Sequence, residues 1–166
     1  MPGTVVGIMG PGSDATEADL LRSYEIGKAS ADRGYVVLTG GRKSGVMETG
    51  LKGAKDAGGL TIGVLPFQQK SDATDYADVA IVTAMGSARN NINILSSDVV
   101  VACGVEAGTL SEIAMALKAD KKVILLTDNH KAVEFLVELG RGKLVYSENV
   151  EDAMTEVQKT LEGIVE

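Results

Sequence analysis

The chain has 166 residues and a formal net charge of −7, with one cysteine and no tryptophan. This length can bury the core of one domain and no Pro- or Ser-rich segment divides it, so we expect a single domain over residues 1–166. The negative charge and the lack of a long basic run argue against nucleic acid as a partner. A lone cysteine, Cys103, excludes an internal disulfide. No run approaches the roughly 20 apolar residues of a membrane span, and no signal-peptide pattern is found, so we expect a cytoplasmic protein with no membrane partner.

Seven apolar runs rich in β-branched residues predict buried strands, which in chain order are Thr4–Met9, Tyr35–Thr39, Leu60–Leu65, Val79–Thr83, Asp98–Cys103, Lys122–Thr127 and Leu144–Tyr146. Helical patterns lie between most of them, and the predicted helices are Thr16–Arg33, Gly45–Ala57, Ala88–Leu95, Thr109–Ala119, Lys131–Leu139 and Val150–Ile164. The polar segment Pro66–Ala77 is predicted to be a loop. This alternation predicts an α/β fold that is Rossmann-like and doubly wound, with a mainly parallel sheet of about seven strands and helices on both faces.

A glycine-rich turn joins the first predicted strand to the first helix. The run Gly10-Pro11-Gly12-Ser13-Asp14-Ala15 matches the pattern GxGxxA, which opens dinucleotide sites. Such sites also need an acidic residue about 20 positions further on, at the end of the second strand. Here that strand ends in Gly40-Gly41, so NAD binding is not predicted. The turn remains a candidate for binding another anionic group.

Two further glycine-rich turns follow predicted strands. The second turn contains Gly40, Gly41, Arg42 and Lys43, but position 37 is not glycine, which excludes a P-loop. The third turn runs from Gly104 to Thr109 and leads into a helix, whose free N–H groups and positive dipole end attract anions. Because ligands of open parallel sheets bind at the carboxyl ends of strands, we expect the three turns to face one crevice.

Two blocks of residues carry a resemblance to a known family. They are Gly40-Gly41-x3-Gly45-Val46-Met47 and Arg89-x8-Asp98-x9-Gly108-Thr109-x2-Glu112, and they resemble the signature blocks of the Lonely Guy family. The resemblance implies Rossmann-like dimers or higher oligomers that cleave the N-glycosidic bond of cytokinin or other nucleoside 5'-monophosphates. It also places Arg89 on the active-site arginine, Gly108 and Thr109 on the phosphate-binding turn, and Glu112 on the catalytic glutamate.

Nearly the whole chain resembles more closely a neighbouring group that includes the molybdenum cofactor carrier proteins, which are binders rather than established enzymes. The residues that carry this resemblance are Gly45-Val46-Met47-Glu48, Gly53-Ala54, Gly58-Gly59-Leu60-Thr61-Ile62-Gly63 and Leu65-Pro66. The chain departs from the hydrolases where they have Pro-Gly-Gly and Met-His-x-Arg-Lys, since it has Gly104-Val105-Glu106 and Gly86-Ser87-Ala88-Arg89-Asn90. Arg42 also replaces a glycine of the first block. This redistribution of charge favours a different ligand.

Glu106 bears directly on anion binding, because a carboxylate beside a phosphate is repelled by about 1 kcal/mol in a water-like dielectric, and by more where water is excluded. We therefore expect Glu106 either to turn outward or to bind a hydroxyl or amine of the ligand. Cys103, at the end of a predicted strand, is interpreted as a small buried hydrophobic residue. The sequence shows no cluster of metal ligands.

The sequence thus predicts a protein that binds a phosphorylated ligand, most simply a carrier of the molybdenum cofactor (a pterin phosphate) or of a nucleotide, with no cofactor required by the protein itself. The predicted binding residues are Gly10, Gly12, Ser13, Gly40, Gly41, Arg42, Lys43, Arg89, Asn90, Gly104, Glu106, Gly108 and Thr109. The alternative is a nucleoside 5'-monophosphate phosphoribohydrolase, in which Arg89 orients the phosphate and ribose while Glu112 stabilises an oxocarbenium-like state or activates water. A third alternative is an oligomeric scaffold with a vestigial site. The expected partners are the small phosphorylated ligand and further copies of the chain, as a homodimer or homotetramer.

Overall fold

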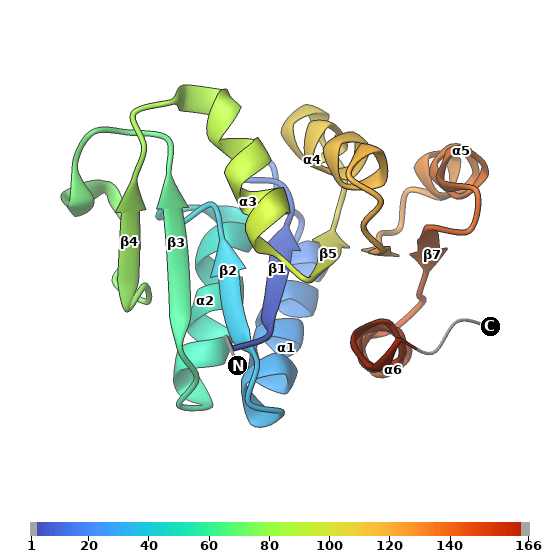
Figure 1. Cartoon of the computed structure of the whole chain (residues 1–166), viewed down its shortest axis with the longest axis horizontal. Coiled ribbons are helices and arrows are strands. Elements are labelled where there is room, and N and C mark those ends of the chain that lie inside the picture. The colour runs from blue at the N-terminus through green and yellow to red at the C-terminus, as the bar shows by residue number, and fades with distance from the viewer. Residues whose placement is uncertain (1–2, 164–166) are drawn as a thin grey trace.

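A computed structural model describes residues 3–163, and these residues form one seven-stranded sheet (Figure 1). The strands are β1 (Val5–Met9), β2 (Val36–Thr39), β3 (Thr61–Leu65), β4 (Val79–Val82), β5 (Val99–Cys103), β6 (Val123–Leu126) and β7 (Leu144–Tyr146). Every pairing between neighbouring strands is parallel. The doubly wound α/β fold predicted from the sequence is therefore confirmed.

The strand order β4-β3-β2-β1-β5-β6-β7 contains one reversal. The chain builds outward from β1 to β4 and then returns to place β5 on the other side of β1. Ligands of open α/β sheets bind in the crevice outside the carboxyl ends of the strands at such a point. The three glycine-rich turns follow β1, β2 and β5, which are the strands around this reversal.

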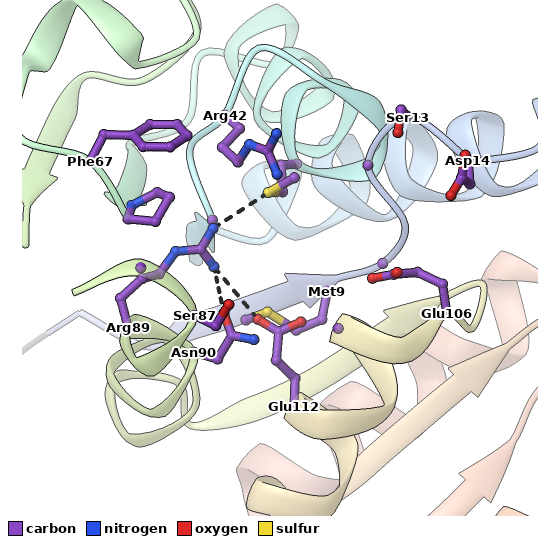
Figure 2. A pocket seen from close by; sticks show the side chains of 17 residues that line it. Met9, Ser13, Asp14, Arg42, Phe67, Ser87, Arg89, Asn90, Glu106 and Glu112 are labelled. Atoms are coloured by element: carbon purple, nitrogen blue, oxygen red, sulfur yellow. Dashed lines mark hydrogen bonds and ion pairs between the residues drawn. The ribbon is translucent and has the colours of Figure 1, made fainter. Parts of the chain in front are cut away.

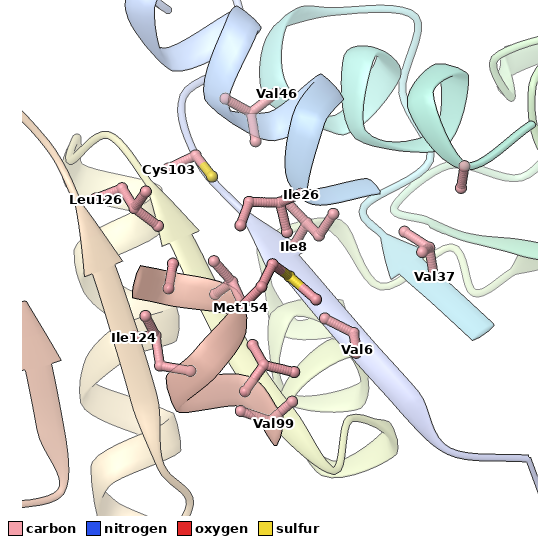
Figure 3. Packing of buried hydrophobic residues seen from close by; sticks show 14 of the residues in the cluster. Val6, Ile8, Ile26, Val37, Val46, Val99, Cys103, Ile124, Leu126 and Met154 are labelled. Carbon is pink, nitrogen blue, oxygen red and sulfur yellow. The ribbon is translucent and has the colours of Figure 1, made fainter. Parts of the chain in front are cut away.

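Three helices cover each face of the sheet. One layer contains α1 (Glu17–Asp32), α2 (Gly45–Asp56) and α6 (Val150–Glu162), and the other contains α3 (Asn90–Ser96), α4 (Ala107–Lys118) and α5 (His130–Gly140). Because side chains alternate along a strand, Ile124 and Leu126 join the first layer's core while Val123 and Leu125 join the second. Figure 3 shows the first of these cores, where Cys103 is fully buried as expected.

Glycines let α1 and α2 pack almost backbone to backbone. A Cβ atom added at Gly27 would lie 2.0 Å from the carbonyl oxygen of Gly50, and one added at Gly53 would lie 2.0 Å from that of Tyr24. The N-terminus of α2 also meets the first turn, where the N–H of Val46 donates to the carbonyl of Pro11 at 3.0 Å. These contacts hold the first and second glycine-rich turns side by side.

The structure corrects the sequence prediction at β4, which is an edge strand and not a buried one. Val79 and Ile81 pair in register with Ile62 and Val64 of β3, so they lie on the face that carries α3. In Figure 1, α3 crosses the sheet near β1, and no helix within residues 3–163 covers β4 on this face. Ile81 is consequently 41% exposed.

Several element boundaries differ from the prediction for local reasons. A 3₁₀ turn, Gly86–Arg89, precedes α3, and the predicted loop contains another, Lys70–Asp72. Helix α4 begins two residues early, at Ala107, because Glu106 caps it. The predicted end of the last helix, Ile164, lies outside the described residues. None of the helices within residues 3–163 is long and apolar enough to cross a membrane.

Candidate functional site

A cavity of about 410 Å³ lies where the strand order reverses, and all three glycine-rich turns contribute to its wall (Figure 2). Its lining residues are Met9, Gly10, Gly12, Ser13, Asp14, Gly40, Arg42, Met47, Pro66, Phe67, Gly86, Ser87, Arg89, Asn90, Glu106, Gly108 and Glu112. The expected single crevice is present, and we refer to it below as the pocket.

Ten of the residues predicted as binding or catalytic line the pocket, and Gly41, Lys43, Gly104 and Thr109 do not. The backbone of Gly41 packs against β3, and an added Cβ there would lie 2.8 Å from the Cα of Gly63. The amino group of Lys43 lies 3.7 Å from the carboxylate of Asp75. The glycines Gly41 and Gly104 both have positive φ and therefore shape their turns.

Seven lining residues were not predicted as binding residues, namely Met9, Asp14, Met47, Pro66, Phe67, Gly86 and Ser87. Pro66 and Phe67 follow β3 directly and begin the segment predicted only as a loop. The sequence signal that could have identified Phe67 as a lining residue was its place directly after a predicted strand, since the carboxyl ends of parallel strands meet at one edge of the sheet.

The first turn lines the pocket and carries free backbone donors. Within residues 3–163, no hydrogen bond uses the N–H groups of Gly12, Ser13 or Asp14, while the carbonyl of Gly12 accepts from the N–H of Ala15 at 3.2 Å. Consecutive N–H groups in such a turn form a concavity that binds anions. The free N–H groups of this turn therefore suit an anion such as a phosphate.

Arg89 and Glu112 form a nearly buried pair on the opposite wall, where they are only 7% and 6% exposed. The Arg89 Nη1 lies 3.9 Å from the Glu112 Oε1 and donates to the side-chain oxygen of Asn90 at 2.9 Å. Figure 2 shows the Arg89 guanidinium directed toward Asn90 and Glu112. The Nη2 of Arg89 lies 3.9 Å from the Met47 sulfur. The Arg89 Nε is buried with no hydrogen-bond partner among the described residues.

Burial changes the proton affinity of both members of this pair. Loss of solvent lowers the pKa of Arg89, against the opposing effect of Glu112. Loss of solvent likewise raises the pKa of Glu112 to about 7, although the hydrogen bond donated by Asn93 at 3.0 Å and the charge of Arg89 favour its ionised form. Glu112 thus changes charge near neutral pH.

Glu106 lines the pocket, but its carboxylate is hydrogen-bonded to the start of α4, where its Oε1 accepts from the N–H of Thr109 at 3.2 Å. It is the N-cap of the helix, with extended backbone angles. Glu106 is therefore not turned outward. Because its negative charge already satisfies the start of α4, this helix end is a poorer phosphate site than the sequence suggested.

A doubly wound α/β fold with a polar, arginine-lined pocket at its strand reversal is the architecture of a protein that binds a small ligand. Residues 3–154 match the SLOG cluster4 family, and the chain belongs to this family. An uncharacterized protein of Archaeoglobus fulgidus is 43% identical over 121 residues, which are 73% of this chain and 78% of that protein.

Two solved structures are similar over nearly their full lengths. The molybdenum cofactor binding protein of the phototrophic bacterium Rippkaea orientalis is 46% identical, with a TM-score of 0.95 over 97% of this chain and 99% of that chain. The molybdenum cofactor carrier protein of Chlamydomonas reinhardtii is 45% identical, with a TM-score of 0.91 over 96% and 99% of the two chains.

Replacing Glu106 tests its effect on anions. We expect Glu106→Ala to tighten the binding of inorganic phosphate about fivefold, because a negative charge leaves the pocket and the Thr109 N–H becomes free. Loss of the helix cap should cost about 1 kcal/mol of stability. NMR titration of the amide signals measures the affinity, and Glu134→Ala on the exposed side of α5 is the control for net charge. Unchanged or weaker binding would contradict this role.

The pKa of Glu112 predicts how stability depends on pH. Because its folded pKa of about 7 lies above the unfolded value of 4.5, the folded protein binds more protons between these values and loses stability as pH rises from 5 to 8. Glu112→Gln removes this loss. The free energy of unfolding of the variant, compared with that of the wild type, should therefore be higher at pH 8 than at pH 5 by up to about 3 kcal/mol. Urea unfolding at both pH values measures the difference, with exposed Glu134→Gln as control. A pH-independent difference would show that Glu112 has an ordinary pKa.

Proposed function

We propose that this chain binds the molybdenum cofactor through its phosphate and carries it without breaking a bond. The observation that carries the proposal is the combination of three free N–H groups, at Gly12, Ser13 and Asp14, with two arginines in one pocket. The similarity to cofactor-binding and carrier proteins over nearly the whole chain supports the choice of ligand.

The polarity of the pocket supports an organic phosphate as the bound part of the cofactor. Arg42 and Arg89 offer planar guanidinium groups, which can form charged hydrogen bonds with ligand oxygens and can stack on flat rings. Asn90 and Ser87 add neutral donors and acceptors that suit the polar edge of a pterin ring. Within residues 3–163, no three His, Cys, Asp or Glu side chains gather to hold a metal ion. The chain's own residues therefore favour holding the cofactor by its pterin phosphate.

Hydrolysis of a nucleoside 5'-monophosphate is the second candidate, and the buried pair of Arg89 and Glu112 favours it. A carboxyl group that titrates near pH 7 is suited to acid–base catalysis. The cap formed by Glu106 counts against this candidate, because it places a carboxylate at the turn to which the hydrolase resemblance assigns the phosphate. We therefore rank the carrier function first.

Binding of isolated molybdenum cofactor tests the proposed function. We expect stoichiometric binding by the wild-type protein and at least tenfold weaker binding by Arg42→Ala, since charged hydrogen bonds contribute about 1.5–3 kcal/mol. Equilibrium dialysis followed by fluorescence of the oxidised pterin measures both. Arg33→Ala, at the far end of α1, controls for the lost charge.

Two results would contradict the carrier function. One is absence of cofactor binding by the wild-type protein. The other is steady release of free base from a nucleoside 5'-monophosphate that is lost in Glu112→Gln, which would identify the hydrolase instead.

Self-association is part of the same proposal, and the face of the sheet that carries α3 is its proposed interface. Val79, Ile81 and Leu95 are exposed there, and Leu95 is 57% accessible. A second copy of this chain would bury these apolar side chains. We place the resulting homodimer or homotetramer in the cytoplasm.

The oligomer is tested by light scattering after gel filtration. We expect the double variant Ile81→Asp with Leu95→Asp to have the mass of one chain while the wild type has that of two or four, because charges in an apolar interface are costly. Leu21→Asp, exposed on α1 of the opposite layer, is the control. Equal masses for the wild type and the double variant would rule out this interface.

A further inference from the structure

Main-chain hydrogen bonds hold the segment that follows β3 in the wall of the pocket. The N–H of Gly86 donates to the carbonyl of Pro66 at 3.0 Å, and the N–H of Ala84 donates to the carbonyl of Phe67 at 2.9 Å. Proline further restricts the backbone at position 66. The backbone that carries the Phe67 ring is thus held in place by hydrogen bonds.

Arg42 reaches the same place from the second glycine-rich turn. Its guanidinium carbon lies 5.7 Å from the centre of the Phe67 ring, within the range of a cation–π interaction. An isolated antiparallel bridge joins Arg42 to Ala73, and the N–H of Thr74 donates to the carbonyl of Gly41 at 2.9 Å. Both halves of the Phe67–Arg42 pair are therefore held in place by main-chain contacts.

The pair lies away from the phosphate-type donors of the first turn. Figure 2 shows Phe67 and Arg42 toward one end of the pocket, and Ser13 and Asp14 toward the other. Although it lines a pocket, Phe67 is 43% exposed. A single exposed aromatic residue is ordinary on a protein surface. An aromatic ring that is fixed in a pocket wall beside a guanidinium is instead a ready surface for another flat group.

We propose that Phe67, together with Arg42, stacks against the fused ring of the ligand, while the N–H groups of Gly12, Ser13 and Asp14 take its phosphate. This inference rests on the proposed function and adds the direction in which the ligand lies. Phe67 is then a residue that selects flat heteroaromatic ligands, because stacking on its face requires a planar ring. The phosphate turn by itself accepts any phosphate ester.

The test separates ring binding from phosphate binding with two probes. Isolated molybdenum cofactor carries both parts, and glycerol 3-phosphate carries only the phosphate. We expect Phe67→Ala and Phe67→Leu to weaken cofactor binding about tenfold, within the range for aromatic stacking of a base, and Phe67→Tyr to bind within about twofold of wild type. None of the three should change the affinity for glycerol 3-phosphate. Phe135→Ala, the chain's other phenylalanine, lies exposed on α5 and should bind both probes as the wild type does.

Each other result is informative. Wild-type cofactor affinity in Phe67→Ala, or in Phe67→Leu, would overturn stacking, since leucine keeps apolar bulk without a ring face. Equal loss for both probes would also overturn it, because the ring would then act through the shape of the pocket. Failure of the wild-type protein to bind the cofactor would overturn the proposed function together with this inference.

Discussion

The reversal of strand order beside β1 is the constraint on which the site depends. It brings the carboxyl ends of β1, β2 and β5 together, so that three turns far apart in sequence line one pocket. The close packing of α1 on α2 keeps this arrangement, since a methyl group at Gly27 would collide with the backbone at Gly50. The pocket therefore depends on where the sheet places these three turns more than on any single side chain.

The charges in the pocket oppose one another, and this balance suits a carrier that must also release its ligand. Arg42 and Arg89 attract an anion. Asp14, Glu106 and Glu112 place carboxyl groups in the same pocket. Glu106 is partly compensated by the helix that it caps, and Glu112 is partly neutral near pH 7 because it is buried. In the proposed function, such a pocket would hold a phosphate less tightly than an unopposed cluster of cations.

Most of the fold could be predicted from sequence, because apolar runs and glycine-rich turns are local signals. The prediction that β4 is buried was wrong, since its composition matches that of a central strand and only the sheet order reveals an edge. The turns around Gly12, Gly40 and Gly108 could be predicted because a glycine-rich run after a strand is itself a local signal. The role of Phe67 and the cap formed by Glu106 could not be predicted, because each depends on a partner that the fold supplies. That partner is Arg42 for the ring and the start of α4 for the carboxylate.

A crystal structure of the protein with bound molybdenum cofactor would decide where the ligand lies. We expect phosphate oxygens within hydrogen-bond distance of the N–H groups of Gly12, Ser13 and Asp14, with the pterin ring against Phe67. Glu106 should still cap α4 in that structure. A phosphate seated on the start of α4 with Glu106 displaced, or a cofactor bound outside the pocket, would contradict this arrangement.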